Sequence, residues 1–287
     1  MSKKDIKAEN DVYFLGSKEG GEKKPNSGKI WVIIGVCIAV IAIILVLIFS
    51  LQKQEPDYYF EPVTHQTIEK TIPSPIKNDT IKGYVEVLEE TVNDVPLFVY
   101  LPHDAEMTLS VGQPDKSDST IIFITQAADI RGDNLEIVGD FVLAGQQLSR
   151  GIAKTGFCAI IDGDITIGVK DNTPLLKKAI DSKGYFFRQY PLVSEGELIE
   201  NNPKNKSIRR ALAVRSSKVV MVESRSAESF HDFSQALIDI GVSDAIYLVG
   251  TNTAFGWYYD KEHNKTEFGV EQPEVPLNTS YIVWRTN

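Results

Sequence analysis

The chain has 287 residues, of which 43% are hydrophobic and 24% charged, a composition typical of globular proteins and unlike collagen-like, coiled-coil or disordered chains. Its 30 Lys and Arg residues against 39 Asp and Glu residues give a formal net charge of −9. This charge argues against nucleic acid as the main partner, because the phosphate backbone would be repelled.

The first prominent feature is an uncharged apolar run over residues 30–51, IWVIIGVCIAVIAIILVLIFSL. As a helix rising about 1.5 Å per residue, it is long enough to span a bilayer core of roughly 30 Å. A cleavable signal peptide has a shorter apolar region and a small-residue cleavage site, and neither is present here. The run therefore predicts one transmembrane helix, with the lipid bilayer as a partner.

The lysines around this run predict its orientation. Four lie within about 15 residues before it and one lies within the same distance after it: Lys18, Lys23, Lys24 and Lys29, then Lys53. The positive-inside rule predicts a single-pass protein of the cell membrane, with a cytoplasmic N-terminus and an extracytoplasmic C-terminal domain. Cys37 lies in the run and Cys158 far beyond it, so no intrachain disulfide is expected, which favours a bacterial envelope protein.

Composition divides the chain into four parts. We expect a cytoplasmic tail over 1–29, the membrane helix over 30–51, a proline-containing extracytoplasmic linker over 52–80 and one folded domain over 81–287. The part beyond the run carries 23 basic and 34 acidic residues, so the expected exported region is acidic.

Short β-branched or aromatic runs predict strands over 84–88, 97–101 and 120–125. Two hairpins follow. The first joins 157–161 to 164–168 through Asp162-Gly163, a pair that suits a type I′ turn, and the second joins 209–214 to 219–223 around 216–218. Asp162 and Asp164 also carry oxygens that suit a cation, but the turn explains them, so no metal-site residue is predicted and the cofactor stays unknown.

Two helices are expected later in the chain. Thr173 as cap and Pro174 at the first helical position predict a helix that stops before Gly184, and a second helix is predicted from about Ala227 to Ile240. A buried strand over 245–249 follows. These elements predict an α+β fold: a mixed β-sheet domain with two main helices, preceded by the transmembrane helix.

Common catalytic motifs are absent from the sequence. It contains no phosphate-binding loop, no His-Glu-x-x-His zinc motif and no Gly-x-Ser-x-Gly elbow, and its four histidines are scattered.

Four segments, in their order and spacing, resemble the phosphodiester glycosidase domain family: 156–163, 186–193, 209–213 and 233–250. This is the family of the enzyme that uncovers mannose-6-phosphate tags, and it has many bacterial envelope members. The resemblance covers roughly residues 120–270. It implies a hydrolase-like domain that acts on or binds a sugar phosphodiester or an envelope polysaccharide.

The chain departs from the family at the loop after the second helix. There the family has Asn-Leu-Asp-Gly-Gly-Gly-Ser, whereas this chain has Tyr-Leu-Val-Gly-Thr-Asn-Thr over 247–253. Val249 stands at the family aspartate and cannot accept a proton or ligate a metal. Either another carboxylate has taken over, or the domain binds without cleaving; the carboxylates considered are Asp129, Asp162, Glu223 and Asp244.

The family strand Arg-Thr-Ala-Leu/Ile-Gly matches 209–213, so the resemblance keeps the arginine at Arg209. Arg209 and Arg210 are neighbours on a predicted strand, so their side chains should point to opposite faces. The candidate catalytic residues are Arg209, Asp162, Glu223 and Asp244. The candidate substrate-binding residues, chosen for anion binding or for their place in the loop, are Arg188, Arg210, Tyr247, Gly250 and Thr253. The alternative function is a non-catalytic ectodomain that serves as a protein-interaction or structural module.

Overall fold

The computed structural model describes residue 40, residues 70–73 and residues 83–286. The chain is divided at Asp57 into two units, and the fold described below belongs to the second unit, Tyr58–Asn287. Within the described part, no helix is long and apolar enough to cross a membrane. The transmembrane helix expected over 30–51 lies outside the described residues, apart from Val40.

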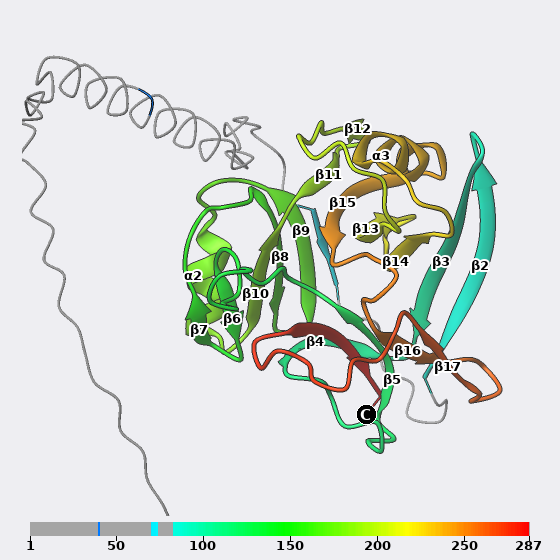
Figure 1. The fold of residues 1–287 in the computed structure, drawn as a ribbon. Helices are drawn as coiled ribbons and strands as arrows, with labels where there is room; N and C mark the ends of the chain where they lie inside the picture. Colours follow the sequence, from blue (N-terminus) through cyan, green and yellow to red (C-terminus); the bar gives the residue numbers. More distant parts are fainter. Residues whose placement is uncertain (1–39, 41–69, 74–82, 287) are drawn as a thin grey trace, which may run out of the picture. The chain divides into compact units, whose positions relative to one another are not determined.

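The second unit is built from three antiparallel sheets (Figure 1). Sheet A has six strands, in the order β1-β9-β8-β10-β6-β7. Its central strand β8 is apolar and buried throughout, and β10 is buried except at Tyr185, whereas the edge strand β7 alternates between exposed and half-buried residues. The strands are β1 (Lys70–Ile72), β6 (Phe141–Leu143), β7 (Gln146–Ser149), β8 (Gly156–Ile161), β9 (Asp164–Val169) and β10 (Tyr185–Gln189).

Sheet B has seven strands, in the order β12-β11-β15-β13-β14-β3-β2. The strands near its centre, β13 and β15, are buried on both faces, while the edge strand β2 is mostly exposed or half-buried. The strands are β2 (Tyr84–Val92), β3 (Val95–His103), β11 (Pro191–Ser194), β12 (Glu197–Leu198), β13 (Arg210–Arg215), β14 (Lys218–Ser224) and β15 (Val242–Leu248).

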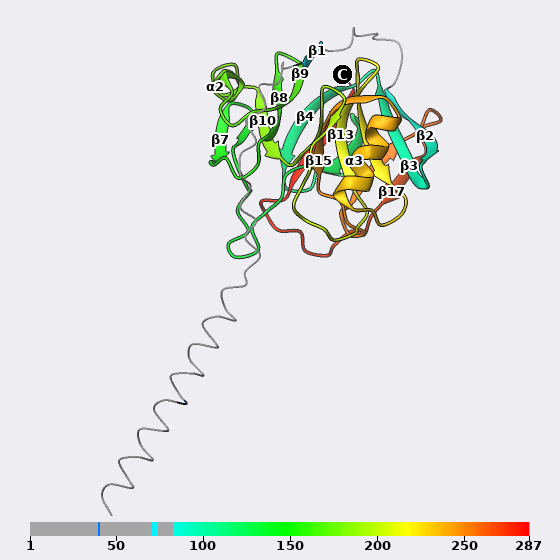
Figure 2. The same cartoon turned by 90° about the horizontal axis from the view of Figure 1, so that it is seen from above.

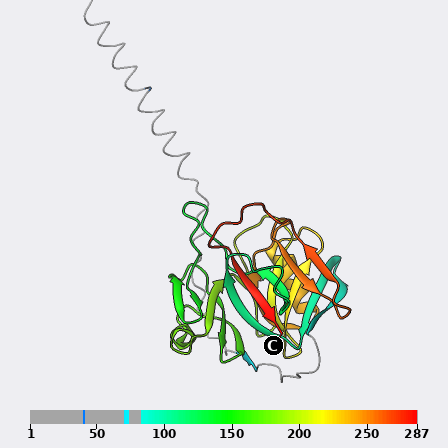
Figure 3. The same cartoon turned by 90° about the horizontal axis from the view of Figure 1, so that it is seen from below.

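Sheet C has five strands, in the order β17-β16-β5-β18-β4. Figure 3 shows the C-terminal strand β18, coloured red, as part of this sheet. The strands are β4 (Glu106–Val111), β5 (Ile121–Gln126), β16 (Gly256–Tyr259), β17 (Lys265–Phe268) and β18 (Ser280–Arg285).

Two short helices cover the outer faces of sheets A and B. Helix α2 (Pro174–Asp181) packs its buried Ala179 against the apolar face of sheet A, together with Phe157 and Phe186. Helix α3 (Phe230–Asp239) packs Phe233 and other apolar side chains against sheet B. Figure 2 shows both helices on the outside of their sheets.

The largest core cluster lies where the three sheets meet. It joins side chains of sheet A, sheet B and sheet C, among them Cys158, Leu212 and Trp284. The buried thiol of Cys158 has a raised pKa because burial disfavours the thiolate. Burial at this junction holds the sheets to one another, since no disulfide is present among the described residues.

The expected α+β class is wrong. The described residues form three antiparallel sheets, and their two helices have only 8 and 10 residues. The helices begin and end close to the expected positions, with Thr173 capping α2 and Ser229 capping α3. However, each covers one sheet face without forming a separate layer, so the architecture is predominantly β.

Both expected hairpins are confirmed. Ile161 pairs with Asp164 across Asp162-Gly163, whose φ angles of 54° and 87° are the positive values that a type I′ turn requires. Arg215 pairs with Lys218 across a two-residue turn at 216–217. Strand β1, inside the range expected as linker, pairs with β9. The expected boundaries of the four parts remain predictions.

Candidate functional site

The carboxyl ends of two strands from different sheets meet at one place. Past the end of β15, the amide of Val249 donates to the carbonyl of Ala127, past the end of β5, at 3.3 Å. The amide of Tyr247 donates to the carbonyl of Tyr190, in the connection between β10 and β11, at 2.8 Å. These two bonds join segments that are 122 and 57 residues apart in the sequence at one side of the domain.

Three aromatic rings pack at this meeting point. The centroid of the Phe230 ring lies 4.9 Å from that of Tyr247 and 5.5 Å from that of Tyr190, and the two tyrosine rings are 6.2 Å apart. Helix α3 contributes the phenylalanine, and sheet B and the β10–β11 connection contribute the tyrosines. We call Tyr190, Phe230 and Tyr247 the aromatic trio.

Two buried cations lie against the aromatic trio. The guanidinium of Arg209 lies 4.0 Å from the centroid of Phe230 and 5.8 Å from that of Tyr247, and the Nζ of Lys154 lies 4.1 Å from that of Tyr190. Both contacts have the geometry of cation–π interactions. Arg209 also donates from Nε to the carbonyl of Glu228 at 2.9 Å and from Nη2 to the carbonyl of Asn205.

Lys154 forms an ion pair with Asp129. Its Nζ donates to Oδ2 of Asp129 and, at 2.9 Å, to Oε1 of Gln189. The lysine side chain is only 5% exposed, whereas the aspartate is 32% exposed. Burial lowers the pKa of Lys154, and the nearby carboxylate opposes that shift. The result is a buried cation directly beneath a carboxylate that solvent reaches.

The pKa of Tyr247 depends on charges of the same cluster of residues. Burial raises the pKa of its hydroxyl, and the negative charge of Asp129 raises it further, while a hydrogen bond from the Gly250 amide and the charge of Arg209 lower it. The Gly250 amide donates to the Tyr247 hydroxyl at 3.1 Å. The hydroxyl therefore stays protonated while it accepts this bond.

The loop after β15 is held tightly at Gly250. A Cβ atom there would lie 2.3 Å from the carbonyl oxygen of Ile208, so only glycine fits. The next residue, Thr251, has a φ of 101°, in the left-handed region that a β-branched residue rarely adopts. Thr251, Asn252 and Thr253 are exposed beside the cluster.

We call Asp129, Lys154, Gln189, Arg209, Gly250 and the aromatic trio the cluster. Three of the expected site residues belong to it: Arg209, Tyr247 and Gly250. Thr253 lies on the exposed loop next to it, where its hydroxyl bonds that of Thr251 at 2.9 Å. As expected, Arg209 and Arg210 contact opposite sides of sheet B, since Arg209 packs on α3 and Arg210 packs on the ring of Phe268.

Arg210 and Glu223 form a buried ion pair away from the cluster. Arg210 donates from Nε to Oε2 of Glu223 and from Nη1 to the carbonyl of Ala254 at 2.6 Å. The hydroxyl of Tyr100 lies 3.5 Å from the other carboxylate oxygen. These contacts occupy both side chains within the core, so the two residues lie outside the cluster.

Arg188 is also buried, and it anchors loops. Its Nε donates to Asp140 at 2.9 Å, and its Nη atoms donate to the carbonyls of Lys170 and Asp171 at 2.8 and 2.6 Å. Its Nη1 also lies 3.4 Å from the carbonyl of Lys154. Arg188 therefore positions the segment that carries Lys154.

The remaining expected carboxylates lie outside the cluster, Asp244 within strand β15 and Asp162 in a turn. Asp244 is buried and accepts from the amide of Glu195 at 3.2 Å, and Asp162 is exposed at the β8–β9 turn. Of the four carboxylates considered from the sequence, Asp129 alone belongs to the cluster. Lys154, Gln189 and Tyr190 were not predicted. Lys154 lies in a polar loop that carries no motif, and in segment 186–193 the anion-binding argument selected only Arg188.

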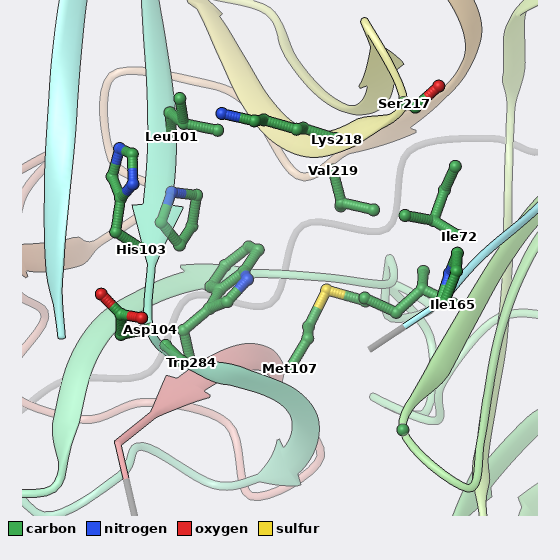
Figure 4. Close-up of a pocket in the computed structure, with 14 residues that line it drawn as sticks. Ile72, Leu101, His103, Asp104, Met107, Ile165, Ser217, Lys218, Val219 and Trp284 are labelled. Atoms are coloured by element: carbon green, nitrogen blue, oxygen red, sulfur yellow. The ribbon is translucent and has the colours of Figure 1, made fainter. Parts of the chain in front are cut away.

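A separate cavity of about 340 Å³ lies where strands of all three sheets converge (Figure 4). Its floor is mainly apolar and includes Met107, Ile165 and Trp284, while Lys218 and His103 lie at its polar side. None of the expected site residues lines it, although Gly163, next to Asp162, does. Within the described residues, no group of three or more His, Cys, Asp or Glu side chains is placed to hold a metal ion.

Comparison with known proteins relates the fold, but not the sequence, to a known enzyme. No family model and no curated protein matches the sequence. The catalytic domain of zebrafish N-acetylglucosamine-1-phosphodiester α-N-acetylglucosaminidase, auto-inhibited by its pro-peptide, matches with a TM-score of 0.54 and 10% identity, over 76% of this chain and 88% of that one. A hypothetical protein from Synechocystis matches with a TM-score of 0.47 and 11% identity, over 72% of this chain and 62% of that one. The first match shows that this domain has a fold like that of a phosphodiester glycosidase.

Proposed function

We propose that the protein binds a sugar phosphodiester, or an envelope glycan that contains one, at the cluster. We further propose that Asp129 takes the role of the family aspartate, whose position is occupied by Val249 in this chain. The observation that carries this proposal is the Asp129–Lys154 pair. Its carboxylate is partly exposed, its Oδ2 is held by a buried ammonium, and Oδ1 accepts no hydrogen bond from residues 83–286. A carboxylate fixed at one oxygen and open at the other is arranged to act on a bound sugar.

The charges of the cluster suit a phosphodiester. Lys154 and Arg209 place two positive charges behind the exposed surface formed by Asp129 and loop 251–253. These fixed charges make the local electrostatic potential positive, which favours a phosphate held next to the cluster as it gains negative charge when its bond to the sugar breaks. In hydrolysis, the hydroxide of the attacking water joins the anomeric carbon and its proton passes to Asp129. The phosphate leaves with the electron pair of the broken bond.

The same proposal places the domain outside the cell. The uncharged run 30–51 and the lysines that precede it support attachment to the cell membrane, with the N-terminus in the cytoplasm. An outward-facing domain would meet the sugar phosphodiesters of envelope glycans. The accessibility of the C-terminal domain to protease added to intact cells tests this orientation, and protection of the domain would contradict it.

The site is tested by incubating the purified full-length protein in detergent with a panel of sugar-1-phosphodiesters, measuring sugar release by chromatography and binding by calorimetry. Asp129→Asn should abolish release, or weaken binding at least tenfold if the protein binds without cleaving. Asp162→Asn is the matched control, because asparagine tolerates the positive φ of that turn, and it should change neither quantity.

Thermal unfolding of both variants shows whether they remain folded. If Asp129→Asn is unfolded, Lys154→Met provides a second route to the same site and should weaken release or binding. Neither release nor binding by the folded wild-type protein on any member of the panel would reject the proposal. Activity that Asp129→Asn leaves intact would reject the role of Asp129.

A further inference from the structure

The loop between β5 and β6 extends outward from the cluster. This loop folds back on itself, since Val138 donates its amide to the carbonyl of Asp129 at 2.9 Å and Arg131 donates to that of Glu136 at 2.8 Å. Residues two apart on an extended arm point to the same side. Arg131 therefore follows Asp129 on one arm, about 7 Å further out.

Lys154, the other member of the Asp129–Lys154 pair, also has an arginine close to it in the chain. Arg150 follows β7 directly and precedes Lys154 by four residues. The intervening segment is fixed to Asp140, which accepts from the Gly151 amide at 3.0 Å and donates its own amide to the Gly151 carbonyl at 2.9 Å. Each member of the Asp129–Lys154 pair is thus linked by a short, anchored stretch of chain to one exposed arginine.

Arg131 and Arg150 line the same groove, which has a volume of about 530 Å³. Its other polar side chains are largely engaged: Ser149 donates to the carbonyl of Ile137 at 2.7 Å, and Asn278 donates to that of Leu135 at 3.1 Å. Neither guanidinium has a hydrogen-bond or ion-pair partner within residues 83–286. The groove therefore offers two guanidinium groups as its available donors.

The charge of this groove is opposite to that of the domain around it. Two arginines and one acid, Glu136, line it, whereas residues 52–287 carry 23 basic and 34 acidic residues. In an acidic domain, arginines more often find carboxylate partners, as Arg215 and Arg225 do here. Two unpaired guanidinium groups at one groove suit the planar, bidentate recognition of a phosphate.

Exposed apolar side chains accompany this groove. Six large hydrophobic residues are exposed within 83–286, and four of them are in or next to its segments, with exposures from 41% to 88%: Leu135, Leu148, Ile152 and Leu277. Leu148 lines the groove. Of the others, Leu135 accepts a hydrogen bond at its carbonyl from the groove residue Asn278, and Leu277 directly precedes Asn278 in the chain. Leucines beside unpaired arginines fit an amphiphile, with its phosphate on the arginines and its hydrocarbon on the leucines.

We propose that this groove binds the phosphate and the first part of the hydrocarbon chain of a lipid-linked sugar phosphate, with the sugar directed toward Asp129. This inference rests on the proposed function and names its substrate class. The ligand would be a phosphodiester between the anomeric carbon of a sugar and a long-chain alcohol.

The test compares two esters of the same sugar-1-phosphate, one with methanol and one with a long-chain isoprenoid alcohol, on the full-length protein in detergent. The wild-type protein should bind the isoprenoid ester at least tenfold more tightly. Arg131→Gln/Arg150→Gln should weaken the binding of both esters at least tenfold. Leu135→Ser/Leu277→Ser should weaken only that of the isoprenoid ester.

The matched control is Lys218→Gln/Lys261→Gln, which removes two positive charges elsewhere on the surface, one of them at the cavity of Figure 4. It should leave both affinities within twofold of the wild type. Equal affinity for the two esters, or leucine variants that do not discriminate between them, would overturn the lipid assignment. If the arginine variants bind both esters as the wild type does, the assignment of the groove as the phosphate-binding site is overturned, while the proposed function stands. Binding of neither ester by the wild-type protein would instead count against the proposed function itself.

Discussion

The ammonium of Lys154 is buried beneath the carboxylate of Asp129, which is about one third exposed. The pair joins two segments 25 residues apart, and Gln189 and the ring of Tyr190 complete the surroundings of the lysine. A buried cation in this position is costly unless an anion accompanies it. The buried ammonium of Lys154 therefore explains why the carboxylate of Asp129 lies at this point of the surface. That carboxylate is the centre of the proposed site.

A first prediction concerns the buried pair of Arg210 and Glu223. Glu223→Gln should lower the free energy of unfolding by about 3 kcal/mol, because it leaves the arginine charge buried with weaker compensation. Urea unfolding measures this loss. Replacing both members, as in Arg210→Met/Glu223→Leu, should recover most of it, since no unpaired charge then remains.

The control for this prediction is Glu89→Gln. Glu89 pairs with Arg225, which also stacks on a ring, but this pair is largely exposed. Its loss should cost less than about 1 kcal/mol. Equal effects of Glu223→Gln and Glu89→Gln would show that burial does not govern the contribution of these pairs.

A second prediction concerns the strained backbone of Thr251. At a φ of 101°, a threonine costs on the order of 1–3 kcal/mol in strain, whereas glycine adopts this conformation freely at an entropic cost of about 0.5–1 kcal/mol. Thr251→Gly should therefore raise the free energy of unfolding by roughly 0.5–1 kcal/mol in urea titrations. Thr253→Gly, at a position without a positive φ, should lower it. Destabilisation of the same size by both changes would mean that Thr251 is not strained.

A third prediction concerns alkaline pH. Burial and the charge of Glu223 raise the pKa of Tyr100 above the ordinary value of 10.0. Above pH 10 the unfolded chain loses this proton while the folded protein keeps it, so the stabilisation is complete below pH 10 and is lost as the pH rises further. For one such group the slope approaches about 1.4 kcal/mol per pH unit.

Tyr100→Phe removes this group, so stability should fall less steeply above pH 10 in the variant than in the wild type. Urea unfolding between pH 9 and pH 11 measures both slopes. Absorbance at the tyrosinate band shows in parallel which hydroxyls ionise before unfolding. An unchanged slope in Tyr100→Phe would show that this hydroxyl does not contribute to alkaline denaturation.

Local chemistry made several features of this protein predictable from sequence. The Asp162-Gly163 pair specifies a type I′ hairpin because both residues tolerate positive φ, and Thr173 with Pro174 specifies where α2 begins. The strand period placed Arg209 and Arg210 on opposite faces. The fold class was not predictable in the same way, since two clear helices gave no measure of how little of the domain they cover.

The sequence by itself thus determined the turns, the helix caps and the side of the strand on which each side chain points, because these depend on a few consecutive residues. Only the tertiary structure decided which charges meet. Arg210 with Glu223 and Lys154 with Asp129 are brought together by the pairing order of strands in three sheets, which depends on contacts between segments remote in the chain. A lysine in a polar loop and an aspartate after a strand have no spacing that reveals their partnership. Their pairing follows from the burial that the assembled sheets impose.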